Sequence, residues 1–373
     1  MFDVLLSMAI SFTIAFLAIP AIITVAETKK LFDLPDERKI HKAHIPSLGG
    51  IGIFAGFMLA CLISIHLNVS AEFQYFFAAA LVMFFLGLKD DILIISPIKK
   101  FIGQVIAAVL IITKGGIQIT SMNGFLGVYE LPEMFSLLLT FFTVIVIINS
   151  FNLIDGIDGL AGTLGLITTS VMGLYFLKAG NVEYAVFAFA LVGSLAAFLI
   201  FNFHPARVFM GDTGSMLIGL VNAILVIKFI NISASPMANF PVDAAPAIGF
   251  TILMIPLLDT LRVFAIRMFH RRSPFSPDRN HIHHLMIDKG WSHRKITFTL
   301  ATFGLSFIAA AYFARSIGCT WLIFGGITIF FSGIAALYFT RKPRLFVVRS
   351  SVKDKDASKI VPLNKDISLG QKN

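Results

Sequence analysis

Continuous hydrophobic segments alternate with short polar stretches along almost the whole chain. These runs predict helices that cross a bilayer, because a membrane barrel would show alternating apolar and polar residues, and lipid offers no water to unpaired backbone groups. We predict eleven such spans. They cover residues 4–25, 48–66, 73–88, 101–113, 134–150, 160–177, 184–203, 214–232, 245–266, 297–314 and 320–339.

Polar clusters stand at the ends of these segments. They are residues 89–91 (Lys-Asp-Asp), 152–158, 211–214 (Gly-Asp-Thr-Gly) and 281–284 (His-Ile-His-His). An even number of spans separates each cluster from the next, so a chain that crosses back and forth brings all four to one face. The pattern favours an enzyme at the lipid–water boundary over a channel or a structural membrane protein.

The composition indicates an all-α polytopic membrane protein. Of the 373 residues, 57% are hydrophobic and 14% are charged, and the mean hydropathy is +0.86, which leaves too little polar surface for a soluble domain. We expect an integral membrane domain over 1–340 and a polar cytoplasmic tail over 341–373. Cys61 and Cys319 are far apart in sequence and are predicted to be packing residues.

The net charge of +9 is a topology signal and does not indicate nucleic-acid binding. With the N-terminus outside, 25 of the 30 Lys and Arg residues fall in the inward segments, as the positive-inside rule requires. The C-terminus is then cytoplasmic. The inward segments are 26–47, 89–100, 151–159, 204–213, 267–296 and 340–373.

One outer segment has a different pattern. Residues 115–130 alternate apolar and polar side chains around Asn123-Gly124. This predicts either a small β-hairpin on the outer surface or an irregular loop.

Two adjacent carboxylates, Asp90 and Asp91, end the third span. Adjacent acids repel and are costly near lipid, so we expect a cation or a donor beside them. Lys99 and Lys100 follow closely and could supply positive charge to a phosphate. The alternative is a solvated helix end without chemistry.

Asn149, Asn152, Asp155 and Asp158 recur every three residues at the end of the fifth span. On a helix this spacing places them along one drifting face. Amides suit recognition of a base or a sugar, and carboxylates suit a hard cation such as Mg²⁺. A glycine-rich helix contact with water-facing polar residues would explain the same pattern.

The loop 204–215 leads into the eighth span and carries Arg207, Asp212 and Thr213. A helix start favours anionic oxygen, and Arg207 can bind a phosphate through two hydrogen bonds. A carboxylate beside such an anion indicates a bridging divalent metal. Simple capping of the helix is the alternative.

The inner loop after the ninth span is rich in basic residues. We expect it to bind phosphate, although its histidine spacing also resembles a zinc site. Asp259 and Arg262 precede it and are expected to pair across one helix turn, with a direct catalytic role as the alternative. The basic residues are Arg271, Arg272, Arg279, His281, His283 and His284.

In their order and wording, these motifs resemble the polyprenyl-phosphate N-acetylhexosamine-1-phosphate transferase superfamily. The resemblance covers about residues 30–290, and the predicted spans extend it to 340. Several long motifs in one order make it specific. The matching stretches are residues 35–41, 46–50, 87–91, 149–161, 204–215 and 273–284.

The resemblance implies transfer of a sugar 1-phosphate from a UDP-sugar to undecaprenyl phosphate in the membrane, with release of UMP. It implies Mg²⁺, or alternatively Mn²⁺, held by Asp212 with Asn152. It assigns catalytic roles to Asp90, Asp91, Asp155, Asp158, His281, His283 and His284, with Asp90 as the candidate base. The substrate-binding residues it implies are Arg38, Lys39, His41, Lys99, Lys100, Asn149, Asn152, Asn202, Arg207, Arg271, Arg272 and Arg279.

The form His-Ile-His-His after Ser-Pro-Phe-Ser-Pro-Asp-Arg resembles the N-acetylglucosamine branch. The phospho-MurNAc-pentapeptide branch, which usually has three consecutive histidines, is the alternative. A lipid-phosphate transporter is a rival class, but transporters usually place ionisable groups at the bilayer midplane. We expect a bacterial inner-membrane location with a cytoplasmic site, and a homodimer is compatible with this fold.

Overall fold

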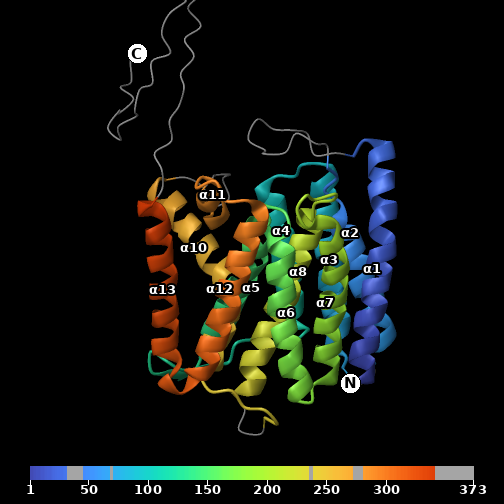
Figure 1. Ribbon diagram of the computed structural model, residues 1–373. Coiled ribbons are helices and arrows are strands. Elements are labelled where there is room, and N and C mark those ends of the chain that lie inside the picture. The colour runs from blue at the N-terminus through green and yellow to red at the C-terminus, as the bar shows by residue number, and fades with distance from the viewer. Residues whose placement is uncertain (32–44, 68–69, 235–237, 272–279, 341–373) are drawn as a thin grey trace, which may run out of the picture.

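The computed structural model describes residues 1–31, 45–67, 70–234, 238–271 and 280–340, and most of them are helical. The long helices run up and down in one bundle (Figure 1). In chain order the helices are α1 (Phe2–Lys29), α2 (Gly49–Ser64), α3 (Glu72–Ile92), α4 (Pro97–Thr113), α5 (Glu133–Ile154), α6 (Leu160–Lys178), α7 (Val182–Asn202), α8 (Gly211–Ser233), α9 (Ala245–Ile252), α10 (Met254–Phe269), α11 (Ile282–Ile287), α12 (His293–Phe313), the 3-10 helix η1 (Arg315–Ile317) and α13 (Cys319–Phe339).

Seven of these helices are long and apolar enough to cross a membrane, and the bent pair α9–α10 makes up to eight. The prediction of a mostly helical polytopic membrane protein is confirmed. Helix α2 is a shorter apolar helix, and α3 and α4 occupy the predicted spans 73–88 and 101–113. The count of eleven crossings and their direction stay predictions.

The ninth predicted span, 245–266, is wrong as one continuous helix. It is broken at Leu253 into α9 and α10, which meet at 77°. Pro256 lies in the first turn of α10 and has no N–H to donate to the carbonyl of Ile252, which favours a break there. The bend turns α10 toward α5, against which it packs.

Helix α8 forms the centre of the bundle. It packs against α3, α5, α2, α6 and α9, and its residues are buried along almost the whole length of the helix. Helices α1 and α13 lie at opposite edges in Figure 1, and most of α13 is exposed. Because the N-terminus of α8 lies at the same end of the bundle as α11, the central helix brings residues 211–213 toward the histidines.

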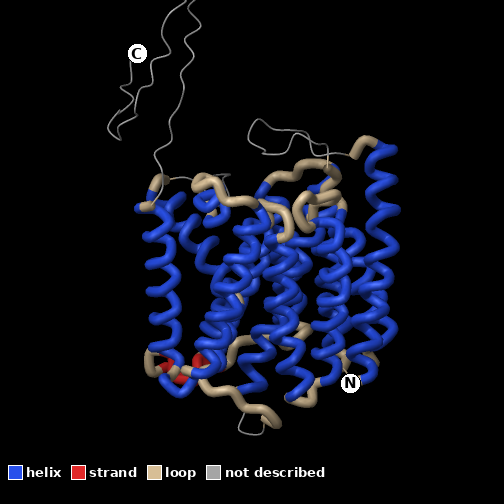
Figure 2. Tube along the Cα trace, in the orientation of Figure 1, coloured by secondary structure: helices blue, strands red, loops and turns tan. Residues whose placement is uncertain are grey.

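The opposite end carries a two-stranded antiparallel sheet, β1 (Ser121–Phe125) with β2 (Val128–Glu130), drawn in red in Figure 2. The turn is Leu126-Gly127, with φ of 52° and 79°, and Asn123 and Gly124 lie within β1. The amide of Leu126 donates to Thr320 Oγ1 at 2.8 Å. This contact with α13 holds the turn and could not be read from local sequence.

Candidate active site

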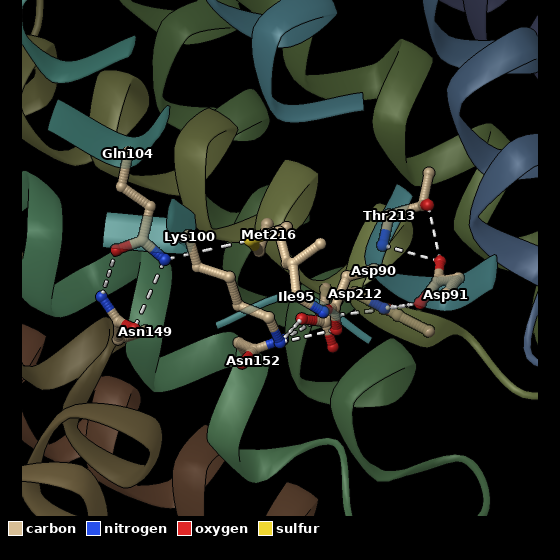
Figure 3. Close-up of polar contacts among 12 residues, drawn as sticks. Asp90, Asp91, Ile95, Lys100, Gln104, Asn149, Asn152, Asp212, Thr213 and Met216 are labelled. Carbon is tan, nitrogen blue, oxygen red and sulfur yellow. Dashed lines mark hydrogen bonds and ion pairs between the residues drawn. The ribbon is translucent and has the colours of Figure 1, made fainter. Parts of the chain in front are cut away.

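Four helix ends meet at one end of the bundle and carry the polar clusters (Figure 3). The last turn of α3 supplies Asp90 and Asp91, and the first turn of α4 supplies Lys100. The first turn of α8 supplies Asp212, and the last turn of α5 supplies Asn152. The structure brings the predicted clusters 89–91, 152–158 and 211–214 together at one end of the bundle.

Lys100 joins two of the carboxylates. Its Nζ lies 2.6 Å from Asp90 Oδ2 and 2.6 Å from Asp212 Oδ2. The other oxygen of Asp90 accepts a hydrogen bond from the amide of Ile95 at 2.9 Å. Two partly buried carboxylates would repel each other strongly, and the ammonium between them offsets that repulsion. The position between Asp90 and Asp212 is therefore suited to a cation.

Asp91 has a different task from its neighbour. Its carboxylate accepts hydrogen bonds from the amides of Asp212 (2.7 Å) and Thr213 (3.1 Å) and from Thr213 Oγ1 (2.6 Å). An anion at a helix N-terminus is favoured by the free N–H groups and the dipole. The alternative that the side chain of Asp212 or Thr213 caps α8 is wrong. The cap is the carboxylate of Asp91, which comes from α3.

Glycines allow α3 to approach α8 this closely. A Cβ at Gly87 would lie 2.5 Å from both Cα and N of Thr213. Gly211, at the start of α8, has a φ of 70°, a conformation that other L-residues rarely adopt. Neither position tolerates a side chain without moving the cap formed by Asp91.

The amide side chains lie in a second layer. Asn149 donates to Gln104 Oε1 at 2.8 Å, and both residues are almost fully buried. Asn152 donates to Ser215 Oγ at 3.0 Å, one helical turn beyond Gly211. Gln104 was not among the predicted site residues, although an amide within the apolar run 101–113 was a signal for it.

A buried carboxylate orients His281, the residue that precedes α11. Asp259 Oδ2 lies 2.8 Å from His281 Nδ1, and Asp259 Oδ1 accepts the amide of Ile282 at 2.9 Å. Arg262 also contacts Asp259 Oδ1, at 2.8 Å. The expected pair of Asp259 and Arg262 is confirmed, and it holds the start of α11 against α10.

His283 is almost fully buried, and neither of its ring nitrogens has a hydrogen-bond partner among the described residues. Burial, together with the nearby charge of His284, lowers the pKa of His283 to about 3. The ring is therefore neutral at physiological pH, so one nitrogen is able to accept a hydrogen bond and the other is able to donate one. The Nε2 and Cε1 atoms of the ring lie against Gly156, where a Cβ would come within 2.6 Å of His283 Cε1.

A cavity of about 330 Å³ opens between these groups. Its wall combines cationic, amide and imidazole side chains, which suits a phosphate-bearing ligand with a polar head. Arg267, from α10, was missed by the sequence analysis; it is 3% exposed and belongs to this wall. The polar residues of the wall are Lys100, Gln104, Asn149, Asn152, Arg267, His281, His283 and His284.

The two remaining acids of the 149–158 motif differ in electrostatics. Burial, followed by the charges of Asp212, Asp91 and Asp158, raises the pKa of Asp155 to about 8. Burial also opposes ionisation of Asp158, but its contacts with His293 and His204 outweigh this and lower its pKa. A cation bound near Asp155 would favour its charged form.

Several predicted binding residues lie away from the cavity wall. Asn202 accepts the amide of Gly159 (2.9 Å) and donates to the carbonyl of Val208 (2.8 Å), so it joins two loops. Arg207 is exposed, with its guanidinium 5.6 Å from the ring centre of Phe201.

Comparison with known proteins agrees with this geometry. Residues 73–230 match the family model described as glycosyl transferase family 4. An undecaprenyl-phosphate alpha-N-acetylglucosaminyl 1-phosphate transferase of Yersinia pestis is 32% identical over 304 residues, which are 80% of each chain. A decaprenyl-phosphate N-acetylglucosaminephosphotransferase of Mycobacterium tuberculosis (strain ATCC 25618 / H37Rv) is 32% identical over 71% of each chain. A probable undecaprenyl-phosphate N-acetylglucosaminyl 1-phosphate transferase of Bacillus subtilis (strain 168) is 30% identical, over 85% of this chain and 86% of its own.

The chain belongs to glycosyl transferase family 4. It is a membrane-embedded transferase of that family, and the predicted resemblance to the N-acetylglucosamine branch is confirmed by the relatives' names. The family match spans α3 to α8, and therefore includes Asp90, Asp91, Lys100, Asn152 and Asp212.

The remaining residues expected to bind substrate lie outside the cavity wall or outside the described residues. Arg271 and Lys99 are exposed at the same end of the bundle as the cavity. Arg38, Lys39, His41, Arg272 and Arg279 lie outside the described residues. Their expected contacts with substrate stay predictions.

Proposed function

We propose that the protein transfers a HexNAc 1-phosphate, with GlcNAc 1-phosphate as the first candidate, from a UDP-sugar to undecaprenyl phosphate, releasing UMP. The observation that carries this is the cavity between α4, α5, α10 and α11, whose wall offers Lys100, Arg267 and three imidazoles beside the carboxylates. Relatives that cover most of the chain have names with the same acceptor and sugar. The site would lie on the cytoplasmic face of a bacterial inner membrane.

The reaction brings several negative charges together. An oxygen of the lipid phosphate forms a bond to the sugar-linked phosphorus, and the bond from that phosphorus to the UMP oxygen breaks. Catalysis then rests mainly on positioning and on charge neutralisation. Lys100 and Arg267 supply fixed positive charge at the cavity wall, and His283 supplies a neutral ring that can donate to a phosphate oxygen.

Asp90 is the candidate group at the lipid phosphate. One carboxylate oxygen of Asp90 forms an ion pair with Lys100, and the other accepts a hydrogen bond from the amide of Ile95. These two contacts fix the orientation of the carboxylate. The last ionisation of a phosphomonoester has a pKa of about 6, so the acceptor is largely dianionic at neutral pH. We therefore assign Asp90 a role in orientation at least as important as proton removal.

A hard divalent cation fits the donors present. Asp212, with Asn152 beside it, offers the oxygen atoms that Mg²⁺ prefers, and Mn²⁺ is the alternative ion. The ammonium of Lys100 between Asp90 and Asp212 supports the suitability of this position for positive charge. When bound, the metal would offset the charge of the diphosphate.

The test is transfer from a panel of labelled UDP-HexNAc donors to undecaprenyl phosphate in detergent, with and without Mg²⁺, for wild type and Asp212→Asn. We expect a lipid product and UMP with one donor, dependent on Mg²⁺ and lost in Asp212→Asn. If UDP-MurNAc-pentapeptide alone is used, the peptidoglycan branch is correct instead. If folded protein releases no UMP with any donor, the proposal is wrong.

A further inference from the structure

Three side chains that could together hold a metal ion lie outside the cavity wall. Asp158 follows α5, His204 follows α7, and His293 begins α12, so three separate segments meet there. One ligand atom from each residue lies within 4.8 Å of the others. His204 Nδ1 is 2.6 Å from Asp158 Oδ2, and His293 Nδ1 is 3.4 Å from Asp158 Oδ1.

We propose that Asp158, His204 and His293 form a zinc site, separate from the Mg²⁺ position at Asp212, and that the ion fastens α12 to the loops around the cavity. Two imidazoles and one carboxylate are a donor set that Zn²⁺ binds well. Mg²⁺ prefers oxygen ligands and usually keeps several of its bound waters, so it competes poorly for two imidazoles and a carboxylate. The proposal does not depend on the transferase reaction.

The spacing is close to what zinc requires. Ligand atoms at about 2.0–2.2 Å from a tetrahedral zinc ion are roughly 3.3 Å from one another. The distance of 3.4 Å between Asp158 and His293 already meets this, and the 2.6 Å contact with His204 must open slightly. Each Nδ1 binds through its lone pair, so its hydrogen is lost and the neutral ring carries hydrogen at Nε2.

Neighbouring groups hold the ligands in place, as outer partners do in metal sites. The amide of Ala206 donates to Asp158 Oδ2 at 3.2 Å, and Arg294 Nε donates to the carbonyl of His204 at 2.8 Å. Asp158 and His293 are buried, whereas the His204 side chain is 39% exposed. An ion can therefore enter from the His204 side, and water can supply the fourth ligand.

Metal content of the purified full chain tests the site. Wild type, His204→Ala and His293→Ala are loaded with zinc in detergent, in the presence of Mg²⁺, and gel-filtered before elemental analysis. We expect about one zinc per chain in wild type and roughly a tenfold loss in both variants. His66→Ala is the control, because His66 is an exposed residue in the segment between α2 and α3, remote in sequence from the cluster. This variant should retain as much zinc as wild type does.

A cobalt titration of wild type tests the metal site even if a histidine variant does not fold. Four-coordinate Co²⁺ with nitrogen ligands gives intense visible bands, and zinc should abolish them. No retained zinc and no cobalt bands in folded wild type would overturn the proposal, leaving a metal-free hydrogen-bonded cluster. Equal zinc in wild type and both histidine variants would overturn it as well. UMP release is measured separately, so failure of the transferase proposal leaves this result unaffected.

Discussion

At the scale of single residues, Lys100 neutralises much of the negative charge of the site. It is the cation between Asp90 and Asp212, and it also belongs to the cavity wall. A charge in that position acts on the carboxylates before substrate binds and on the phosphates afterwards. Lys100→Met keeps much of the side chain's bulk and removes the charge together with the N–H groups that contact Asp90 and Asp212.

We predict that Lys100→Met lowers UMP release by about 10²-fold, the usual effect of losing one group that stabilises charge in a transition state. Lys114→Met is the matched control, because Lys114 follows the other end of the same helix. The measurement is steady-state UMP release at saturating donor. Equal rates for the two variants would show that Lys100 has no part in the reaction.

Asp155 gives a pH prediction. Its folded pKa of about 8 exceeds the unfolded value of 3.8, so the native state binds more protons between these values. Stability must then fall as pH rises through this window. Without Mg²⁺, the melting temperature of wild type should fall more steeply between about pH 5 and about pH 8 than that of Asp155→Asn.

The difference between the two pH profiles is the quantity to compare, since other acids titrate in both proteins. Adding Mg²⁺ should flatten the wild-type profile, because a nearby cation favours the charged carboxylate. Parallel profiles without Mg²⁺ would contradict the raised pKa of Asp155.

At the scale of elements, the contact between α3 and α8 decides where the site forms. Gly87 lets the two helices touch, and Asp91 then caps α8. Both features involve the backbone of Thr213. A small change in this contact should therefore move the cap and Asp212 together.

We predict that Gly87→Ala destabilises the protein by about 1–3 kcal/mol, as overpacking usually does, and also lowers transfer. Gly333→Ala is the control within an apolar helix, since a Cβ there meets nothing within 4 Å. It should be neutral or slightly stabilising, because Ala favours helix over Gly by about 1 kcal/mol. Thermal melts in detergent compare the two, and a stable Gly87→Ala protein would refute the close-contact argument.

At the scale of the whole molecule, the two ends of the bundle differ. One end carries α11 (Figure 1), and the other carries β1 and β2 (Figure 2). The positive-inside bias predicts that the first end faces the cytoplasm. Cys61 and Cys319 are both buried, so an introduced cysteine can report its own side with little background.

We predict that an impermeant thiol reagent labels Glu130→Cys in intact spheroplasts and labels Lys89→Cys only after permeabilisation. Both positions are exposed, one in β2 and the other in the last turn of α3. Labelling after permeabilisation is the control for accessibility. The reverse pattern would invert the topology and place the site outside.

The sequence by itself determined the class of the molecule and the approximate membership of its site. Long apolar runs leave no fold other than a helical bundle in lipid, and the alternation of spans sends Asp90, Asn152, Asp212 and His281 to one end. Local propensity also decides most helix limits, because the polar clusters interrupt the apolar runs.

Only the tertiary structure decided the role of each polar group. Asp90 and Asp91 are adjacent in sequence, yet one pairs with Lys100 and the other caps α8. The turn at Leu126-Gly127 and the meeting of Asp158 with His293 likewise depend on partners far along the chain. Hydrogen bonds and ion pairs depend on distances of a few tenths of an ångström, and these are set by packing between helices, which no local pattern encodes.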